Sequence, residues 1–350
     1  VVTKKGFGYR FAEEDPAKFH GIGKFDPVTG KKLASKVKTF SDAFGETMQE
    51  LARNNDRVCA ITAAMPGGTG LLDFQKQFPK RTFDVGIAEE HAISMAGGLA
   101  KQGMIPVAAL YSTFLQRGYD QALHDVCIQN LPVTFMIDRA GISNEDGQSH
   151  QGLFDIAFLR HIPGMTIIAP ADEQELRMAV RAAYELNAPC AIRYPKSAVV
   201  LPDANEIKSF TIGKWQTLSE GSEATILAVG SMTAAALRVA AQLQKEGHAV
   251  RVINASTIKP LDAACLDRLF AEGRPVFTLE EHVLAGGFGS SVLEYAAAQN
   301  AAVRIIPLGV ADTFVQHGDH QHLLEDVGLD DNTLTKRIQS ELSKEDKPNG

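Results

Sequence analysis

Short apolar runs alternate with helical stretches along most of the chain. A run of about four to eight apolar residues is typical of a buried strand, whereas apolar positions three and four residues apart indicate one face of a helix. We therefore expect strands at 58–62, 82–85, 106–110, 133–137, 166–169 and 190–194, and helices at 90–102, 119–129 and 173–186. Strands that alternate with helices predict a mainly parallel, doubly wound α/β sheet.

The N-terminal part of the sequence has a different pattern. Residues 1–37 are rich in Gly, Pro and Lys and show no sustained period, which is typical of a connector. They open with Val1-Val2-Thr3, which resembles the end of a strand, so we expect the chain either to derive from a longer one or to complete a sheet supplied elsewhere. A helix is predicted from about Phe40, with Ser41 as its N-cap, because apolar residues then recur at helical spacing.

A second α/β segment follows a candidate linker that contains Pro202-Asp203-Ala204-Asn205. Its expected strands lie at 224–229, 248–254, 275–280 and 303–307, and its expected helices at 233–245 and 290–299. The predicted division is a connector at 1–37, a first domain at 38–200, a linker at 201–213, a second domain at 214–342 and a disordered polar tail at 343–350.

The composition narrows the class of protein. Of the 350 residues, 45% are hydrophobic and 22% are charged, as in an ordinary globular protein. A net charge of −7 argues against nucleic-acid binding. Four scattered cysteines favour buried thiols in a reducing cytosol over a disulfide framework or a zinc site. We find neither an apolar stretch of about 20 residues nor a basic leader, so we expect a cytoplasmic protein without a membrane partner.

The first candidate site is Asp84-Val85-Gly86-Ile87-Ala88-Glu89-Glu90-His91, between a strand and a helix. Ligands of open α/β folds gather at the carboxyl ends of strands. Apolar neighbours predict that Glu89 is buried, which favours its protonated form and lets it share a proton near neutral pH. Acidic residues that stabilise the start of a helix would give the same pattern, and the spacing does not decide between the two.

The second candidate is Tyr111-Ser112-Thr113-Phe114-Leu115-Gln116-Arg117, just past an apolar run. Aromatic rings beside hydroxyls and an arginine could stack on a flat ring and bind an anion. A capped helix start with a core phenylalanine is the alternative, and the segment taken alone favours it.

The third candidate is the loop after the strand expected at 133–137. Asp138-Arg139-Ala140-Gly141 and Asp146-Gly147-Gln148-Ser149-His150-Gln151-Gly152 place Arg, Asp and His close together, and polar loops at strand ends are where sites lie. A surface turn held by its own aspartate would look similar.

Three further motifs are weaker. Amides of Gly286-Gly287-Phe288-Gly289-Ser290-Ser291 could hold an anion, although close packing of a helix on the sheet explains these glycines better. The segment His317-Gly318-Asp319-His320-Gln321-His322 hints at a metal, but nothing completes a site, so a solvated helix start is favoured and no metal site is predicted. Met65-Pro66-Gly67-Gly68-Thr69-Gly70 is either a loop beside a cofactor or a turn.

Taken in order, these segments resemble the 1-deoxy-D-xylulose-5-phosphate synthase family of the transketolase superfamily. The resemblance also covers Phe19-His20-Gly21, Lys24-Phe25-Asp26-Pro27, Arg193-Tyr194-Pro195, Lys259-Pro260-Leu261-Asp262 and Glu280-Glu281. It implies a pyrimidine-binding domain with a parallel sheet, then a transketolase C-terminal domain with a mixed sheet. It also implies a thiamine-diphosphate-dependent transferase that decarboxylates pyruvate and joins the remainder to D-glyceraldehyde 3-phosphate, for isoprenoid and thiamine synthesis.

The resemblance also assigns roles to residues. Glu89 matches the acid that hydrogen-bonds the aminopyrimidine ring of thiamine diphosphate, and Phe114 matches the aromatic that stacks on that ring. Ile87 and Met65 are expected on the cofactor side, and His20 matches a connector histidine that approaches the active site. The residues matched to the substrate side are Tyr111, Arg117, Arg139, Asp146, His150 and Lys196, with arginines suited to phosphate and Asp146 and His150 suited to hydroxyls and proton transfer.

The sequence departs from the family at several positions. The Gly-Asp-Gly…Asn motif that holds Mg²⁺ and the diphosphate is absent, so the resemblance implies an N-terminal diphosphate-binding domain or subunit as a partner, in addition to a homodimer. Lys196 stands where arginine is usual, which keeps the charge but loses the bidentate fork. Glu90 and Ile142-Ser143-Asn144-Glu145 also differ, and Glu145 adds negative charge near the expected phosphate position.

Three functions stay open. The main hypothesis is a synthase portion that becomes active with a diphosphate-binding partner. The beta subunit of a 2-oxo acid dehydrogenase, or a split transketolase, shares the architecture, but segment 19–27 and Asp146…His150 fit these less well. A non-catalytic regulatory remnant is the third. The presence of Glu89 and Phe114 argues against it, and the missing motif argues for it.

Overall fold

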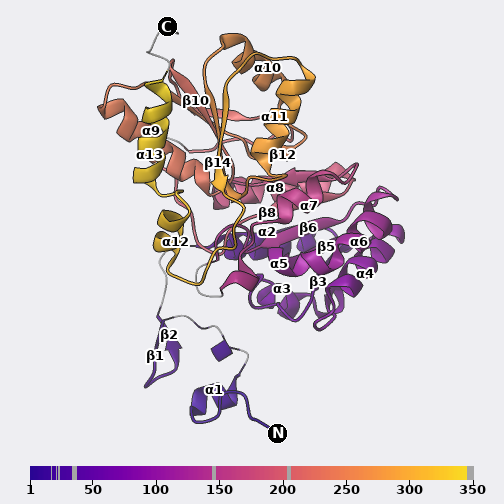
Figure 1. Cartoon of the computed structure of the whole chain (residues 1–350). Coiled ribbons are helices and arrows are strands. Elements are labelled where there is room, and N and C mark those ends of the chain that lie inside the picture. The colour runs from indigo at the N-terminus through magenta and orange to yellow at the C-terminus, as the bar shows by residue number, and fades with distance from the viewer. Residues whose placement is uncertain are drawn as a thin grey trace. The chain divides into compact units, whose positions relative to one another are not determined.

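The computed structural model of the chain describes residues 1–16, 18–20, 22, 24–33, 38–143, 147–202 and 206–344 (Figure 1). These residues belong to two compact units, Val1–Lys38 and Thr39–Gly350, which are described separately. Within them, none of the helices combines the length and the apolar composition needed to cross a bilayer.

The N-terminal unit is built from short elements around a small aromatic cluster. The Tyr9 ring lies 5.5 Å from Phe19 and 5.9 Å from Phe25 between centroids. The expected strand end at Val1-Val2-Thr3 is wrong, because these residues are exposed and lie outside every strand. The elements are α1 (Arg10–Glu14), the 3-10 turn η1 (Lys18–His20) and the antiparallel pair β1 (Phe25–Asp26) and β2 (Lys31–Lys32).

A seven-stranded sheet forms the first part of the larger unit, with the order β12-β7-β8-β6-β5-β3-β4. All neighbouring strands are parallel except β12 and β7. Most of these strands are buried at nearly every position, as expected of a parallel sheet covered on both faces. The strands are β3 (Val58–Thr62), β4 (Thr82–Asp84), β5 (Ile105–Tyr111), β6 (Thr134–Asp138), β7 (Thr166–Ile168), β8 (Cys190–Arg193) and β12 (Thr257–Lys259).

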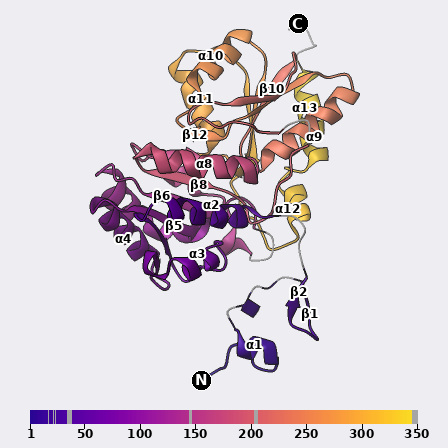
Figure 2. The same ribbon diagram turned by 180° about the vertical axis from the view of Figure 1, so that it is seen from behind.

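Helices cover both faces of this sheet. One face carries α2 (Phe40–Asn54) and α8 (Glu173–Leu186), both in view in Figure 2. The other face carries α4 (Glu89–Lys101), the π-helical turn η4 (Ala122–Cys127) and α7 (Asp155–Arg160). Shorter pieces are α3 (Leu72–Gln77), η2 (Pro79–Arg81), α5 (Ser112–Leu115), η3 (Gln116–Gly118), α6 (Tyr119–Gln121) and η6 (Gln148–His150).

The predicted N-cap of α2 is wrong by two residues. Thr39 is the N-cap, because its side chain accepts from the Asp42 N–H while the Asp42 carboxylate accepts from the Thr39 N–H. Such a reciprocal capping box satisfies two backbone donors at once. The Ser41 hydroxyl instead donates to Asp138 Oδ2 at 2.6 Å, at the end of β6.

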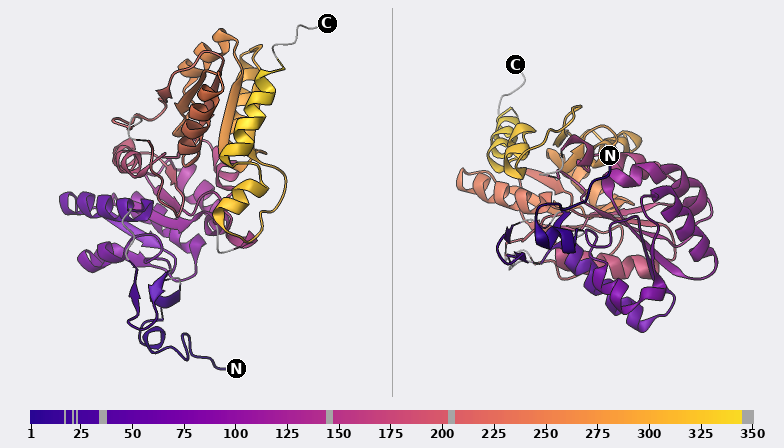
Figure 3. Two further views of the ribbon diagram at one scale, coloured as in Figure 1. Left: turned by 90° about the vertical axis from the view of Figure 1, so that its left-hand side faces the viewer. Right: turned by 90° about the horizontal axis from the view of Figure 1, so that it is seen from below.

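A five-stranded mixed sheet forms the rest of the unit, with the order β14-β13-β10-β11-β9. Strand β9 is antiparallel to β11 and the other neighbours are parallel, so the expectation of two doubly wound α/β sheets is confirmed (Figure 3). The strands are β9 (Gln216–Ser219), β10 (Ala224–Ala228), β11 (Val250–Asn254), β13 (Val276–Val283) and β14 (Ile305–Val310). The helices are α9 (Met232–Lys245), α10 (Ala263–Glu272), α11 (Phe288–Ala298), α12 (His320–Asp326) and α13 (Asp331–Leu342).

Side chains and backbone join the two sheets directly. One apolar core cluster contains residues of both, such as Phe135 and Leu227. Buried Asn254 donates from its amide nitrogen to the Glu175 carboxylate at 2.9 and 3.0 Å. The Lys259 ammonium, in β12, donates to the carbonyl oxygens at the end of α7. All four cysteines are buried and free, as the sequence predicts.

Candidate functional site

Most of the predicted site residues lie in one continuous group at the carboxyl ends of β4, β5 and β6. The group extends from Glu89, which starts α4, through Arg117 to Phe114 and Tyr111. It continues to Arg139 and His150 in the loop after β6. Parallel strands bring the loops at their carboxyl ends to one edge of the sheet, so segments far apart in sequence meet there.

Glu89 is buried, as the apolar pattern predicts. Its side chain is 3% exposed, and Arg117 Nη1 lies 3.3 Å from its Oε1 and 3.4 Å from its Oε2. The Arg117 side chain itself is 55% exposed. Glu89 occupies the first turn of α4, where the helix dipole favours a negative charge. The carboxylate is therefore buried, with a partly solvated cation on its outer side.

Two stacked aromatic rings form the next part of the site. The rings of Tyr111 and Phe114 lie 5.3 Å apart at an interplanar angle of 21°. The Arg139 guanidinium lies over the Tyr111 ring, 3.7 Å from its centroid, at the favourable face for a cation. A Cβ on Gly68 would lie 1.8 Å from the Tyr111 hydroxyl, so the loop after β3 approaches this ring as only glycine permits.

The guanidinium of Arg139 is held by polar contacts that are partly buried. Arg139 has a φ of +57°, a region that residues with a side chain seldom adopt. Its Nη1 donates to Gly68 O at 2.9 Å and to Asp138 Oδ1 at 3.1 Å. Burial raises the pKa of Asp138 to about 6, although Arg139 and the Ser41 hydroxyl act in the opposite direction.

His150 ends the turn η6 and lies beside the aromatic pair. Its ring contacts Phe114 edge to face with centroids 5.4 Å apart, and its Nδ1 lies 3.0 Å from Ser149 Oγ. The imidazole therefore faces the same side of the site as the stacked rings. Asp146, predicted as its neighbour on the substrate side, and Glu145 lie outside the described residues.

Other predicted residues lie apart from this group. Ile87 is 81% exposed and does not cover Glu89, and its place on the cofactor side stays a prediction. Met65 is buried in the loop after β3, where its carbonyl accepts from Thr69 N and Oγ1. His20 belongs to η1 of the N-terminal unit, and its approach to the site stays a prediction.

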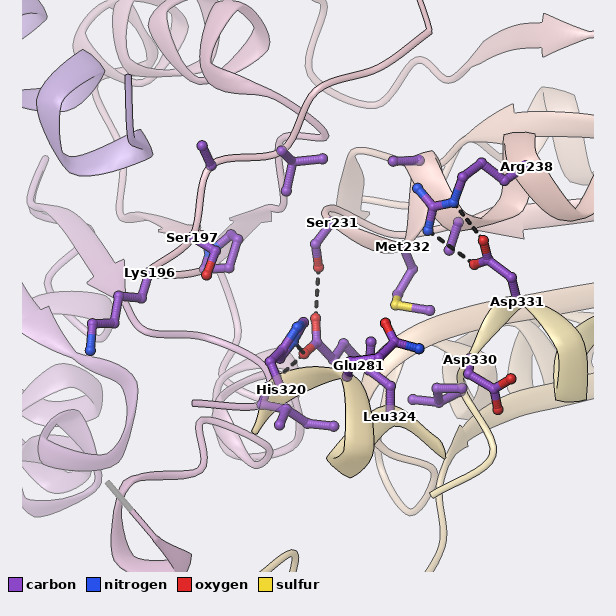
Figure 4. Close-up of a pocket in the computed structure, with 18 of the residues that line it drawn as sticks. Lys196, Ser197, Ser231, Met232, Arg238, Glu281, His320, Leu324, Asp330 and Asp331 are labelled. Atoms are coloured by element: carbon purple, nitrogen blue, oxygen red, sulfur yellow. Dashed lines mark hydrogen bonds and ion pairs between the residues drawn. The ribbon is translucent and has the colours of Figure 1, made fainter. Parts of the chain in front are cut away.

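Lys196 lines a cavity of about 630 Å³ between the segment after β8, the start of α9 and α12 (Figure 4). The cavity also contacts Ile142 and Ser143 of the loop after β6. Figure 4 shows that the Lys196 ammonium points away from the Glu281 carboxylate. Lys196 thus shares this cavity with Ile142 and Ser143 of the loop that carries Arg139.

The sequence motifs did not indicate the buried ion pair between Arg193 and Asp155. Arg193 Nε lies 2.7 Å from Asp155 Oδ2, with side chains 5% and 1% exposed. The Ser112 hydroxyl donates to the other Asp155 oxygen at 3.2 Å, which links the pair to the start of α5. The available signal was an arginine inside an apolar strand, since a buried arginine needs a carboxylate partner.

The weaker motifs have structural roles. The amides of Phe288 and Gly289, in the glycine-rich segment, bind an anion of the chain itself, the Glu280 carboxylate, at 2.7 Å each. Burial raises the pKa of Glu280 to about 7, and these amides limit the increase. Asp319 caps α12 by accepting from Gln321 N. Across the described residues, no cluster of three or more His, Cys, Asp or Glu could hold a metal ion.

Two domain families match the sequence in the order in which the sheets occur. Residues 36–200 match the family described as transketolase, pyrimidine binding domain, and residues 213–334 match transketolase, C-terminal domain. The 1-deoxy-D-xylulose-5-phosphate synthase of Clostridium tetani is 48% identical over 338 residues, 97% of this chain and 54% of that protein. The synthase of Pelotomaculum thermopropionicum is 51% identical over 94% of the chain and 52% of its own length. The chain spans about half the length of these curated relatives.

Solved structures with the same fold include a split-gene transketolase, described as an inactive β4 tetramer. It is 33% identical with a TM-score of 0.77, and the match covers 87% of this chain and 98% of that one. Transketolase from Campylobacter jejuni is similar in fold alone, with 20% identity and a TM-score of 0.73 over 87% of this chain and 47% of its own.

Proposed function

Because the chain belongs to the transketolase family, whose members depend on thiamine diphosphate, we propose that it is the pyrimidine-binding and C-terminal portion of a 1-deoxy-D-xylulose-5-phosphate synthase. The reaction converts pyruvate and D-glyceraldehyde 3-phosphate into 1-deoxy-D-xylulose 5-phosphate and CO2. The observation that carries the proposal is the buried Glu89 carboxylate, connected through Arg117 to the Phe114 ring. The high identity to curated synthases supports pyruvate as the donor.

The described residues fit the pyrimidine part of the cofactor. An aminopyrimidine needs a hydrogen-bonding acid at its ring nitrogen and an aromatic surface on its face, and Glu89 and Phe114 supply these groups. When bound, thiamine diphosphate accepts the electron pair that remains after CO2 leaves. Glu89 would be the hydrogen-bond partner of the ring nitrogen, and its burial would keep bulk water away from that contact.

The acceptor side of the site carries two guanidinium groups, each of which also contacts a carboxylate of the chain. Arg139 and Arg117 carry guanidinium groups beside the stacked rings, and such groups suit the phosphate of the aldehyde. We assign to His150 the binding of the aldehyde's hydroxyls and proton transfer, and we assign Tyr111, which stacks on Phe114, to the substrate side. Lys196, in the adjoining cavity, adds a further cation, although as a point charge without a fork.

A partner is proposed to hold the diphosphate and Mg²⁺. The described residues contain no acidic or histidine cluster suited to a metal ion. A diphosphate-binding domain, in the same polypeptide or as a separate subunit, would complete the site, and we expect the assembled enzyme to be a cytoplasmic homodimer of such units. The similar split-gene transketolase chain is described as inactive in its tetramer, which supports the need for a complementary chain.

The same similarity supports one alternative, a subunit of a split transketolase, because that chain is matched over 98% of its length. The two functions differ in the donor, which is a ketose phosphate for a transketolase and pyruvate for the synthase. Parallel assays, one with a ketose phosphate as the donor and one with pyruvate, therefore distinguish the two functions.

The test combines the chain with a supplied diphosphate-binding domain, taken from the part of the Clostridium tetani synthase that this chain does not match. Pyruvate, the aldehyde phosphate, thiamine diphosphate and Mg²⁺ are added, and CO2 and ketose phosphate are measured. We expect turnover only when the domain is added. We also expect the substitution Glu89→Ala to lower this turnover by about 10²–10⁴-fold. The control Glu90→Ala alters an exposed neighbour in the same helical turn and should leave turnover unchanged.

Circular dichroism and sedimentation establish that the pair is folded and assembled. Absence of CO2 release from such a pair would contradict an enzymatic role and leave the regulatory remnant as the better account. Turnover of a ketose phosphate in place of pyruvate would establish the split transketolase instead.

A further inference from the structure

The loop after β6 is closed at its neck by backbone hydrogen bonds. Gly141 N donates to Gly152 O and Gly152 N donates to Gly141 O, both at 2.8 Å. The described residues of this loop, 139–143 and 147–152, carry Arg139 at its entry and His150 near its exit. These two side chains contact the Tyr111 and Phe114 rings, so the position of the loop sets their geometry in the site.

A carboxylate from the other sheet reaches the backbone of this loop. Glu281 lies in β13, and its Oε1 accepts from Ile142 N at 2.7 Å. Its Oε2 accepts from the Ser231 hydroxyl at 2.8 Å, and His320 Nε2 lies 3.3 Å from Oε1 (Figure 4). Glu281 is only 3% exposed. One buried side chain therefore connects the loop to the starts of α9 and α12.

The backbone conformation of the loop matches this contact. Gly141 has a φ of +87°, and a Cβ there would lie 2.7 Å from the Glu281 carboxyl carbon. Glycine is required by both the dihedral angle and the close approach. A second connection runs from Ser143 N to Gln151 Oε1 at 2.6 Å and from Gln151 Nε2 to Gln316 O at 3.0 Å. The loop is thus held at two points, by Glu281 of β13 and by Gln316 in the segment before α12.

The adjacent glutamate of β13 provides a comparison. Glu280 is equally buried, but its carboxylate accepts from Phe288 N and Gly289 N at the start of α11. Glu280 therefore stabilises a helix of its own sheet, whereas Glu281 is directed at the loop that carries two proposed substrate groups. The two carboxylates are similarly buried, but Glu280 binds backbone amides of α11 and Glu281 binds a backbone amide of the loop after β6.

Resting on the proposed function, we propose that Glu281 is a positioning residue for the acceptor aldehyde: its carboxylate fixes the loop after β6 so that Arg139 and His150 face the aromatic pair. A charge-assisted hydrogen bond to a backbone N–H in a buried place is stronger and more directional than a neutral one. The loop cannot shift without leaving the buried N–H of Ile142 without this acceptor, which is costly. The five-stranded sheet then contributes to the site by holding the loop after β6 in position.

Two measurements test the role of Glu281. The first is backbone hydrogen exchange on the chain itself, which requires no activity. Glu281→Ala should raise exchange in residues 139–143 and 147–152, and Glu280→Gln should not. Glu281→Gln keeps an oxygen that can accept from Ile142 N, so it should restore part of the protection.

The second measurement is the kinetics of the chain with the supplied diphosphate-binding domain. Glu281→Ala should raise KM for D-glyceraldehyde 3-phosphate on the order of tenfold, the effect of losing one charged hydrogen bond, with a much smaller change in KM for pyruvate. Glu281→Gln should recover most of this loss, and Glu280→Gln should change both KM values equally or not at all. If Glu281→Ala fails to fold, Ser231→Ala removes one partner of the carboxylate and should give a smaller shift of the same kind.

The outcomes separate this inference from the proposed function. The positioning role would be overturned if Glu281→Ala left the hydrogen exchange of the loop unchanged, or if it changed the two KM values equally. It would also be overturned if Glu280→Gln raised loop exchange and the KM for the aldehyde as Glu281→Ala is expected to do. Absence of turnover in the wild-type pair would overturn the proposed function, and the exchange experiment would still decide whether Glu281 holds the loop.

Discussion

Substituting Asp155 by alanine tests the buried ion pair that joins α7 to the end of β8. The change leaves the Arg193 guanidinium in the interior, where the carbonyl oxygens of Gly152 and Glu281 lie 3.4 Å away. The original partner oxygen lies 2.7 Å from Nε, with both side chains at most 5% exposed. Removing one member of a buried pair costs about 3–5 kcal/mol. We expect Asp155→Ala to lower the free energy of unfolding by that amount, measured from urea midpoints at neutral pH.

A surface pair of similar length provides the control. Arg181 and Glu50 lie 2.8 Å apart but are 44% and 52% exposed, so Glu50→Ala should cost less than about 1 kcal/mol. Combining Asp155→Ala with Arg193→Met removes both buried charges and should cost at least about 1 kcal/mol less than the sum of the single changes. An Asp155→Ala cost no larger than that of Glu50→Ala, or strict additivity in the double variant, would refute the reasoning.

Two further predictions concern stability. Gly98→Ala in α4 should stabilise the protein by about 0.5–1 kcal/mol because its Cβ meets no atom within 4 Å, whereas Gly97→Ala should destabilise it because its Cβ would lie 2.7 Å from the carbonyl oxygen of Asp125. Thermal midpoints measure both, and shifts of the same sign would contradict the packing argument. The pKa of Asp138 is raised from the ordinary 3.8 to about 6, so between pH 3.8 and about pH 6 the folded state binds more protons than the unfolded state. As pH rises through this range, Asp138 therefore lowers the free energy of unfolding by up to about 3 kcal/mol. Urea titrations of wild type and Asp138→Asn from about pH 4 to pH 7 should show a flatter dependence in the variant, and identical slopes would contradict the assignment.

Much of the fold is predictable because buried parallel strands are apolar on both faces. The runs that became β3 and β8 stand out for this reason, and both were predicted to within a residue. Strand β9 is mostly polar and partly exposed, so it gave no such run. Strand β12 has only three residues and is defined by pairing with β7, a contact between distant segments that periodicity does not encode.

The site was predictable where chemistry and strand ends coincide, and less so where burial depends on distant partners. Glu89, Phe114 and Arg139 lie in one group, as the motifs suggested. Hydrophobicity does not specify which surface covers a residue, and the side chain of Ile87 is exposed. Asp155 and Glu281 were missed because their partners lie 38 and 139 positions away in sequence.

The pairing of β12 with β7 has a practical consequence for dissecting the protein. A fragment that ends at residue 200 would retain β7 but lose residues 257–259, and β7 would become an open edge with unpaired backbone groups. Exposed edges of this kind recruit other strands and promote aggregation. Lys259 would also be lost from the carbonyl oxygens that end α7. Separate production of the two halves therefore requires a redesigned edge, for example by grafting residues 257–259 back onto β7, rather than a cut in the linker alone.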